Sequence, residues 1–187
     1  IEEGRLSLEK IRIAVEGRLA REATRPSALA VSGTVELAEL TAVPFLPLPA
    51  LEPWALRGAA EVQGEFQGRF DDWRTASIRA RVRSGHLQAR QLPLDQLVCT
   101  IEQREGALRV QIPSALFADG KLAGELTLRH ESADRQAFLF QADLIGMALD
   151  RLAQVVPAWR NRAVTGRASA HATLAGTWQA RESWKGE

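Results

Sequence analysis

The sequence predicts an all-β fold, mainly an antiparallel meander, that forms either a curved sheet with a groove or a sandwich, with one short helix. Apolar and polar residues alternate with period two through most of residues 76–144, and turn-forming residues separate the alternating runs. Helical spacing displaces this alternation in one segment only, residues 147–156. We therefore expect strands almost throughout.

The first alternating run contains Ile78, Ala80 and Val82, which alternate with arginines, and Ser84-Gly85 after it predicts a turn. The next run ends at Arg104-Glu105-Gly106, which predicts a tight reversal. A further apolar segment, residues 115–118, leads into Asp119-Gly120, a strong hairpin signal. Together these signals predict about six consecutive antiparallel strands between residues 76 and 144.

The helix is predicted from Leu149, Leu152, Ala153 and Val156, which recur at helical spacing before Pro157. The chain also repeats weakly, because an offset of 108 residues places Gly58 on Gly166, Gly68 on Gly176, and five other pairs of similar residues on each other. We accordingly divide the chain into a partial β unit with a Leu/Pro connector (1–57), a central meander with the helix (58–164) and the start of a further unit (165–187).

Composition limits the classes of partner. Lys and Arg number 24 against 23 Asp and Glu, so no broad field attracts nucleic acid, and none is expected to bind. No segment approaches the ~20 uninterrupted apolar residues of a membrane-spanning helix. The sequence starts at Ile1 and stops at Glu187 without a terminal cap or polar tail, which predicts a fragment of a longer protein.

Few residues suggest chemistry. His86, His130 and His171 are dispersed without metal-ligand spacing, and Asp71-Asp72 is more typical of a turn than of a catalytic pair. Cys99 has no disulfide partner and is expected to be a small core residue. We therefore predict no enzyme activity, no catalytic residue, no metal and no cofactor.

Period-two alternation places one apolar set on a single side of the sheet. The same alternation describes a sandwich core and an open groove, so the sequence leaves both possibilities open. Arg79, Arg81 and Arg83 are expected to face water on the other side, although such a stripe can also contact phosphate groups. The predicted groove-lining residues are Ile78, Ala80, Val82, Leu97, Cys99, Ile101, Leu108, Val110, Ile112, Leu122, Leu126, Leu128, Phe138 and Phe140.

Four segments carry a family resemblance: ADGKLAGEL (118–126), ADLIGMALDRL (142–152), VTGRASA (164–170) and LAGTW (174–178). In this order they resemble the C-terminal region of AsmA-like proteins, the family that includes the TamB-like and YhdP-like bacterial envelope proteins. The matching positions are mostly apolar residues and glycines. The family's N-terminal membrane anchor has no counterpart in this sequence.

The resemblance implies a periplasmic protein, anchored to the inner membrane in its full-length form, that binds or conducts phospholipid or another acyl lipid between the two membranes and supports outer-membrane biogenesis. Envelope proteins are further expected partners. The alternative is a structural or protein-interaction β-sandwich module of a large envelope protein, which binds through an edge strand. A hydrolase or a carbohydrate-binding protein is a third class, for which the five scattered tryptophans are the main argument.

Overall fold

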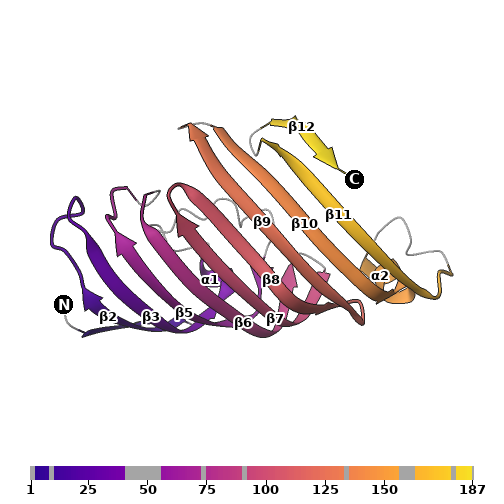
Figure 1. Ribbon diagram of the computed structural model, residues 1–187. Coiled ribbons are helices and arrows are strands. Elements are labelled where there is room, and N and C mark those ends of the chain that lie inside the picture. Colours follow the sequence, from indigo (N-terminus) through magenta and orange to yellow (C-terminus); the bar gives the residue numbers. More distant parts are fainter. Residues whose placement is uncertain are drawn as a thin grey trace.

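The computed structural model describes residues 3–8, 11–40, 56–72, 75–89, 92–132, 135–155, 163–177 and 180–186. These residues form one antiparallel sheet that is twisted and strongly curved, because its strands bow along their length (Figure 1). Eleven strands follow one another in the order β1-β2-β3-β5-β6-β7-β8-β9-β10-β11-β12, and the short β4 pairs with β6 off this path. The predicted all-β fold is confirmed, and the sheet is open rather than closed.

The elements are β1 (Glu3–Leu8), β2 (Ile11–Arg18), β3 (Ser27–Glu36), α1 (Leu37–Leu40), β4 (Leu56–Arg57), β5 (Ala59–Gly68), β6 (Ser77–Ala89), β7 (Leu92–Arg104), β8 (Ala107–Phe117), β9 (Gly120–Ser132), β10 (Arg135–Ala148), α2 (Leu149–Val155), β11 (Arg167–Thr177) and β12 (Ala180–Gly186). The predicted helix corresponds to α2. The single turn α1 was not expected from the sequence.

Two predictions about the meander are wrong. Ser84-Gly85 is not a turn, because it lies inside β6, which is 13 residues long. Residues 107–117 form one strand instead of two, so β6 to β10 are five strands and not about six. In both places the residues of a strand irregularity resemble those of a strand end.

The two tight reversals occur where the sequence predicts them, with one shift. Glu105 and Gly106 have φ angles of 52° and 76°, as a two-residue turn between twisted strands requires. The next turn is formed by Ala118 and Asp119, with φ angles of 49° and 58°, so Gly120 is already the first residue of β9. Aspartate, like asparagine, adopts positive φ more readily than most residues, which explains the turn position of Asp119. Alanine has no such preference, so the sequence did not predict Ala118 as a turn residue.

The loops gather at two opposite ends of the strands. One end, which we call the loop end, contains residues 19–26, residues 69–72 and 75–76, and the turn at 105–106. The helices α1 and α2 and the turn at 118–119 lie at the other, which we call the helix end (Figure 1).

The repeat has a structural counterpart. A strand, a short helix and a glycine of positive φ follow one another at β3-α1-Gly58 and again at β10-α2-Gly166. In both, the first helical residue donates its backbone N–H to the glycine carbonyl at 3.0 Å, from Leu37 to Gly58 and from Leu149 to Gly166. The ladder continues across both predicted unit boundaries, from β3 to β5 and from β10 to β11, and the division into units stays a prediction.

A line of strand irregularities crosses the sheet near the helix end. The β6–β7 ladder skips Gly85 and Gln96, and Gln96 has a φ of 52°. The register also shifts between Ile112 and Ala115 in β8 and between Leu144 and Met147 in β10. The two register shifts are bulges, which bend a strand and increase its twist, whereas the β6–β7 pairing skips one residue on each strand and keeps its register. Past the skipped pair the inward-facing side of β6 changes, so the buried residue after Ser84 is Leu87 and not the residue at 86.

Candidate functional site

The strand register places all fourteen predicted groove-lining residues on one face of the sheet, which we call the apolar face. Residues directly opposite each other in an antiparallel pair point to the same side. Ala80 lies opposite Ile101, Ile101 opposite Val110, Val110 opposite Leu126, and Leu126 opposite Phe140. The remaining nine are spaced by even numbers of residues from these five on the same strands.

The central row of this face is longer than the sequence predicted. It runs through Val15, Val31, Gly64, Ala80, Ile101, Val110, Leu126, Phe140 and Leu174, one residue from each strand between β2 and β11. All nine are half-buried. A second layer packed on this row would bury them fully. The middle of the apolar face is therefore accessible from solvent along nine strands.

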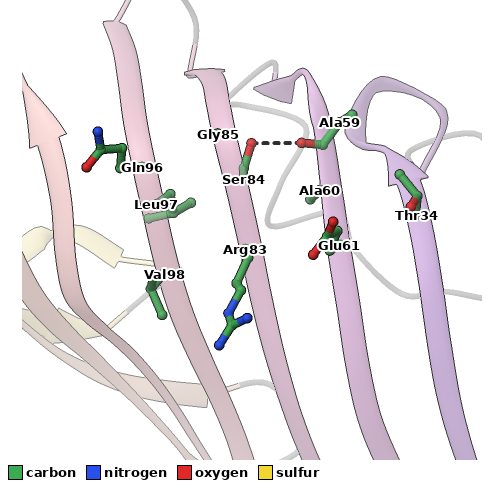
Figure 2. Close-up of a pocket in the computed structure, with 10 residues that line it drawn as sticks. All are labelled: Thr34, Ala59, Ala60, Glu61, Arg83, Ser84, Gly85, Gln96, Leu97 and Val98. Atoms are coloured by element: carbon green, nitrogen blue, oxygen red, sulfur yellow. Dashed lines mark hydrogen bonds between the residues drawn. The ribbon is translucent and has the colours of Figure 1, made fainter.

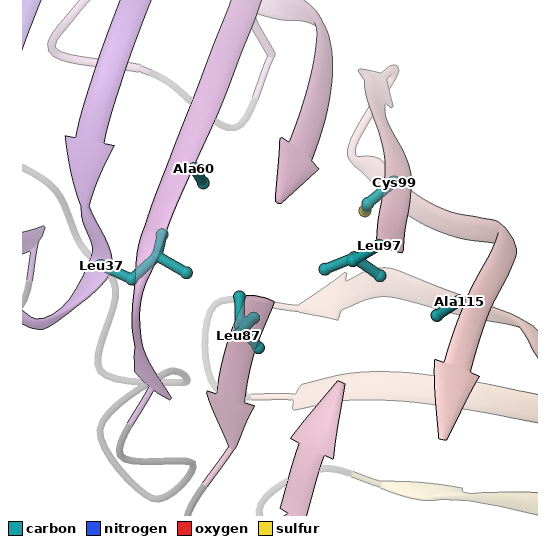
Figure 3. Close-up of a cluster of buried hydrophobic side chains, with 6 residues drawn as sticks. All are labelled: Leu37, Ala60, Leu87, Leu97, Cys99 and Ala115. Atoms are coloured by element: carbon teal, nitrogen blue, oxygen red, sulfur yellow. The ribbon is translucent and has the colours of Figure 1, made fainter. Parts of the chain in front are cut away.

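The helix end of the apolar face is covered. Leu37 from α1, Leu56 from β4 and Leu87 from the tip of β6 pack with Leu97 and Ala115 in one cluster, whose buried members Figure 3 shows. The strand tips beyond the irregularities, together with α1 and β4, thus act as a roof over this end. Ala153 of α2 is also buried, as is Met147 at the end of β10.

Cys99 belongs to the covered part. Its side chain is 8% exposed, and burial raises the pKa of its thiol to about 11. At neutral pH the thiol is therefore protonated, and it packs as a small hydrophobic group. The predicted core position of Cys99 is confirmed.

Polar side chains interrupt the apolar face at its loop end. Gln103 lies between Ile78 and Leu108 in the cross-strand order and is 4% exposed. His130 and Gln136 follow on β9 and β10, with 3.1 Å between the imidazole Nδ1 and the amide Nε2. Sequence reasoning missed Gln103 and Gln136 because it selected lining positions by apolarity.

Aromatic side chains flank this polar segment. Phe70, from the loop after β5, stacks on Phe66 with ring centroids 4.8 Å apart. Trp184 of β12 meets Phe138 edge to face at 5.3 Å and donates its indole N–H to the Thr177 carbonyl at 2.9 Å. Trp184 remains 37% exposed and Phe70 47% exposed. The other four tryptophans lie outside the described residues.

The opposite face carries paired charges, and we call it the outer face. Arg79, Arg81 and Arg83 are exposed there, as predicted, opposite Glu65, Gln63 and Glu61 of β5. Arg109 forms two hydrogen bonds to the Glu125 carboxylate, at 2.7 and 2.8 Å. These bonds, together with one from Gln111, lower the pKa of Glu125 to about 2. The sheet thus has one charged and one apolar side.

The histidines have closer partners than the sequence indicated. His86 Nδ1 lies 2.6 Å from Asp95 Oδ1, and His171 Nδ1 lies 2.7 Å from Asp143 Oδ1. His171 Nε2 also lies 3.2 Å from the Thr173 hydroxyl. The Asp143 carboxylate, the His171 imidazole and the Thr173 hydroxyl therefore form a line of contacts. The His171 and Asp143 side chains are each about 60% exposed on a sheet surface. A nucleophilic hydrolase needs donors for the developing oxyanion and a shielded substrate site beside such a group, and these side chains face open solvent instead.

Within the described part of the chain, no group of three or more His, Cys, Asp or Glu residues could hold a metal ion. Asp71 and Asp72 form the predicted turn: Asp71 accepts hydrogen bonds from Arg69, and the Asp72 carbonyl accepts one from the Thr75 N–H at 3.2 Å. This loop is therefore explained by its own hydrogen bonds.

A shallow depression of about 420 Å³ lies over β5, β6 and β7 at the irregularity of Gly85 and Gln96 (Figure 2). The exposed side chains Thr34, Glu61 and Arg83 line it from the outer face, and Leu97 contributes to its floor. Ser84 points its hydroxyl at the Ala59 carbonyl, 2.7 Å away. The depression is thus separate from the accessible middle of the apolar face.

Comparison with known proteins adds no relative: no protein-family model, no curated protein and no solved structure matches this chain. The resemblance to AsmA-like proteins therefore stays a prediction. Among the described residues, no helix is both long enough and apolar enough to cross a membrane.

Proposed function

We propose that this chain is a non-catalytic segment of an AsmA-like periplasmic protein, which binds or conducts phospholipid between the inner and outer membranes and so supports outer-membrane biogenesis. In the full-length protein, an N-terminal segment would anchor it to the inner membrane. The single observation that carries the proposal is the half-buried central row of the apolar face, which crosses nine strands and over which the described residues form no second layer.

The energetics favour an acyl chain as the occupant. A fully buried methylene group is worth ~0.8 kcal/mol, so a hydrocarbon chain gains free energy in proportion to the part of its surface that this face removes from water. The charged outer face would meanwhile stay in water, because removal of its arginines and glutamates from water costs free energy even where they pair across strands. A sheet with one charged and one apolar side suits an aqueous compartment that lipid must cross.

The test is site-specific photo-crosslinking in cells of a diderm bacterium that express the full-length protein. A photoreactive side chain at Leu126 or Phe140, both in the central row, should capture phospholipid. The matched control is Gln141, the neighbour of Phe140 on the outer face, which should capture none. Absence of lipid adducts at both central-row positions in the folded protein would contradict the proposal.

The alternative, a module that binds other proteins through an edge strand, is favoured by a different observation. Each of β1 and β12 has one hydrogen-bonded neighbour among the described strands, so each has a second edge that no described strand pairs with. The same crosslinking experiment separates the two functions. Adducts of a protein at β1 or β12, without lipid adducts at Leu126 or Phe140, would favour the interaction module.

A further inference from the structure

The apolar face ends in two chemically different borders. At the helix end its border is hydrocarbon, because the roof places Leu37, Leu56 and Leu87 over it. The Ser84 hydroxyl, which lies in this region, is satisfied within the chain by the carbonyls of Ala59 and His86, at 2.7 and 3.0 Å. This end therefore suits the methyl terminus of an acyl chain and excludes a hydrated group.

At the loop end the border is polar. His130 is two residues beyond Leu128 on β9, and Gln136 is two residues before Phe138 on β10, so both lie on the apolar face where its hydrocarbon surface stops. Gln103 lies in line with Leu108, Leu128 and Phe138. Gln103 is buried, whereas His130 and Gln136 are half-buried, and beside their contact with each other their imidazole and amide groups can hydrogen-bond to the ester and phosphate oxygens of a lipid.

The aromatic side chains beside this border support the same assignment. Phe70 and Trp184 are each partly exposed and partly packed on an apolar-face residue. Trp184 also has its indole N–H in a hydrogen bond. Tryptophan, with an apolar body and a polar tip, is enriched where hydrocarbon meets head groups in membranes, whereas Phe70 adds apolar surface only. Trp184 thus places one residue typical of a membrane–water interface at the loop end.

The distance between the borders fits one acyl chain. On β9 the hydrocarbon surface extends from Leu122 to Leu128, which is ~20 Å at ~3.3 Å per residue. One leaflet of a bilayer contributes about half of a hydrocarbon core ~30 Å thick, or ~15 Å. A phospholipid tail therefore fits between the two borders when it lies along the strands.

On the basis of the proposed function, we propose that bound phospholipid has one orientation: its acyl tails lie along the strands toward the roofed helix end, and its head group lies at the loop end beside His130 and Gln136. Successive lipids along the sheet would then all present their head groups at the same border. A lipid could move across the strands from one position to the next without its head group crossing the apolar face.

The test uses two photoreactive phosphatidylcholines, one with a diazirine in the head group and one with a diazirine at the end of an acyl chain. Each is supplied to the purified full chain in vesicles of phosphatidylethanolamine and phosphatidylglycerol, and the adducts are located by mass spectrometry. We expect head-group adducts near the half-buried residues 130 and 136, and tail adducts near Ile112 and Leu122. Labelling of the same positions by both probes would overturn the orientation while leaving lipid binding intact.

A variant sharpens the result. The double substitution His130→Leu and Gln136→Leu extends the hydrocarbon surface, so head-group adducts near these positions should fall several-fold while tail adducts persist. The control Gln141→Leu places the same side chain on the outer face and should change neither pattern. Unchanged head-group labelling in the double variant would contradict the role of this border. Failure of both probes to label the unsubstituted chain would overturn the proposed function together with the orientation.

Discussion

Two positions on β7 allow a covered part of the apolar face to be compared with an uncovered part. Leu97 and Ile101 lie on the same strand and on the same side, yet Leu97 is 8% exposed and Ile101 is half-buried. Leu97 is a buried member of the cluster under the roof of α1, β4 and the strand tips, whereas Ile101 packs against that cluster and keeps part of its side chain exposed. Alternation therefore determines which side of a strand is apolar, whereas long-range packing determines whether that side becomes a core or a surface.

The largest expected effect of a substitution is at the covered end. Leu87→Ala removes a side chain that is 3% exposed in the roof cluster, and it should lower the free energy of unfolding by ~2–5 kcal/mol. Leu126→Ala, in the open middle, should cost about 1 kcal/mol, because its side chain is only half-buried. Urea denaturation followed by circular dichroism measures both values. Equal losses at the two positions would mean that the middle of the face is covered after all.

Thiol reactivity gives a second comparison of the same regions. A rise of the Cys99 pKa from 9.0 to about 11 lowers the thiolate fraction at neutral pH by roughly a hundredfold, and the roof also limits access. Iodoacetamide should therefore modify Cys99 slowly in the folded chain and rapidly in denaturant. In a Cys99→Ser background, Val110→Cys should react much faster than Cys99 does, since it replaces a half-buried side chain. Similar rates at the two positions would remove the distinction between the ends.

The line of irregularities can be tested at Gln96. A φ of 52° costs a residue with a side chain ~1–2 kcal/mol, which glycine avoids. Gln96→Gly should therefore stabilise the chain, by less than about 1 kcal/mol once the greater freedom of glycine in the unfolded state is included. Thr100→Gly on the same strand, where φ is not positive, should instead destabilise it. Destabilisation by both would argue that Gln96 is an ordinary strand residue.

The smallest effect is expected on the outer face. Hydrogen bonds from Arg109 and Gln111 lower the pKa of Glu125 from its ordinary 4.5 to about 2 in the folded chain. The stability that this carboxylate contributes is therefore fully present above about pH 4.5 and is lost as the pH falls toward 2. Solvent screens a side chain that is 32% exposed, so the loss should be modest. Thermal unfolding of Glu125→Gln should show a weaker decline over this pH range than the unsubstituted chain.

Much of the fold could be predicted because it depends on local signals. Period-two alternation identified the apolar face, and helical spacing before Pro157 identified α2. The strand irregularities were missed because they have no distinctive local signature. Pro113-Ser114 and Ser84-Gly85 resemble strand ends in sequence, and only pairing with the neighbouring strands carries the chain through them.

The candidate site was predicted in part for the same reason. Its fourteen apolar members follow from alternation, but Val15, Val31 and Leu174 belong to strands whose place in the sheet depends on long-range pairing. The cross-strand pairs His86–Asp95 and His171–Asp143 join residues whose proximity depends on register. The open groove and the closed sandwich could not be separated in advance, because the difference is the absence or presence of a second layer.

The two strand–helix–glycine segments, β3-α1-Gly58 and β10-α2-Gly166, which we call crossings, have a consequence for the length of the sheet. From β3 to β10, the equivalent strands of the two crossings, the sheet advances by six strand positions, or ~29 Å at ~4.8 Å per strand. Since each crossing leaves the chain on the next strand of the same sheet, a protein with further copies of this unit would grow in fixed increments. The number of units, rather than the sequence of any one unit, would then set the distance that the sheet spans between two fixed attachment points.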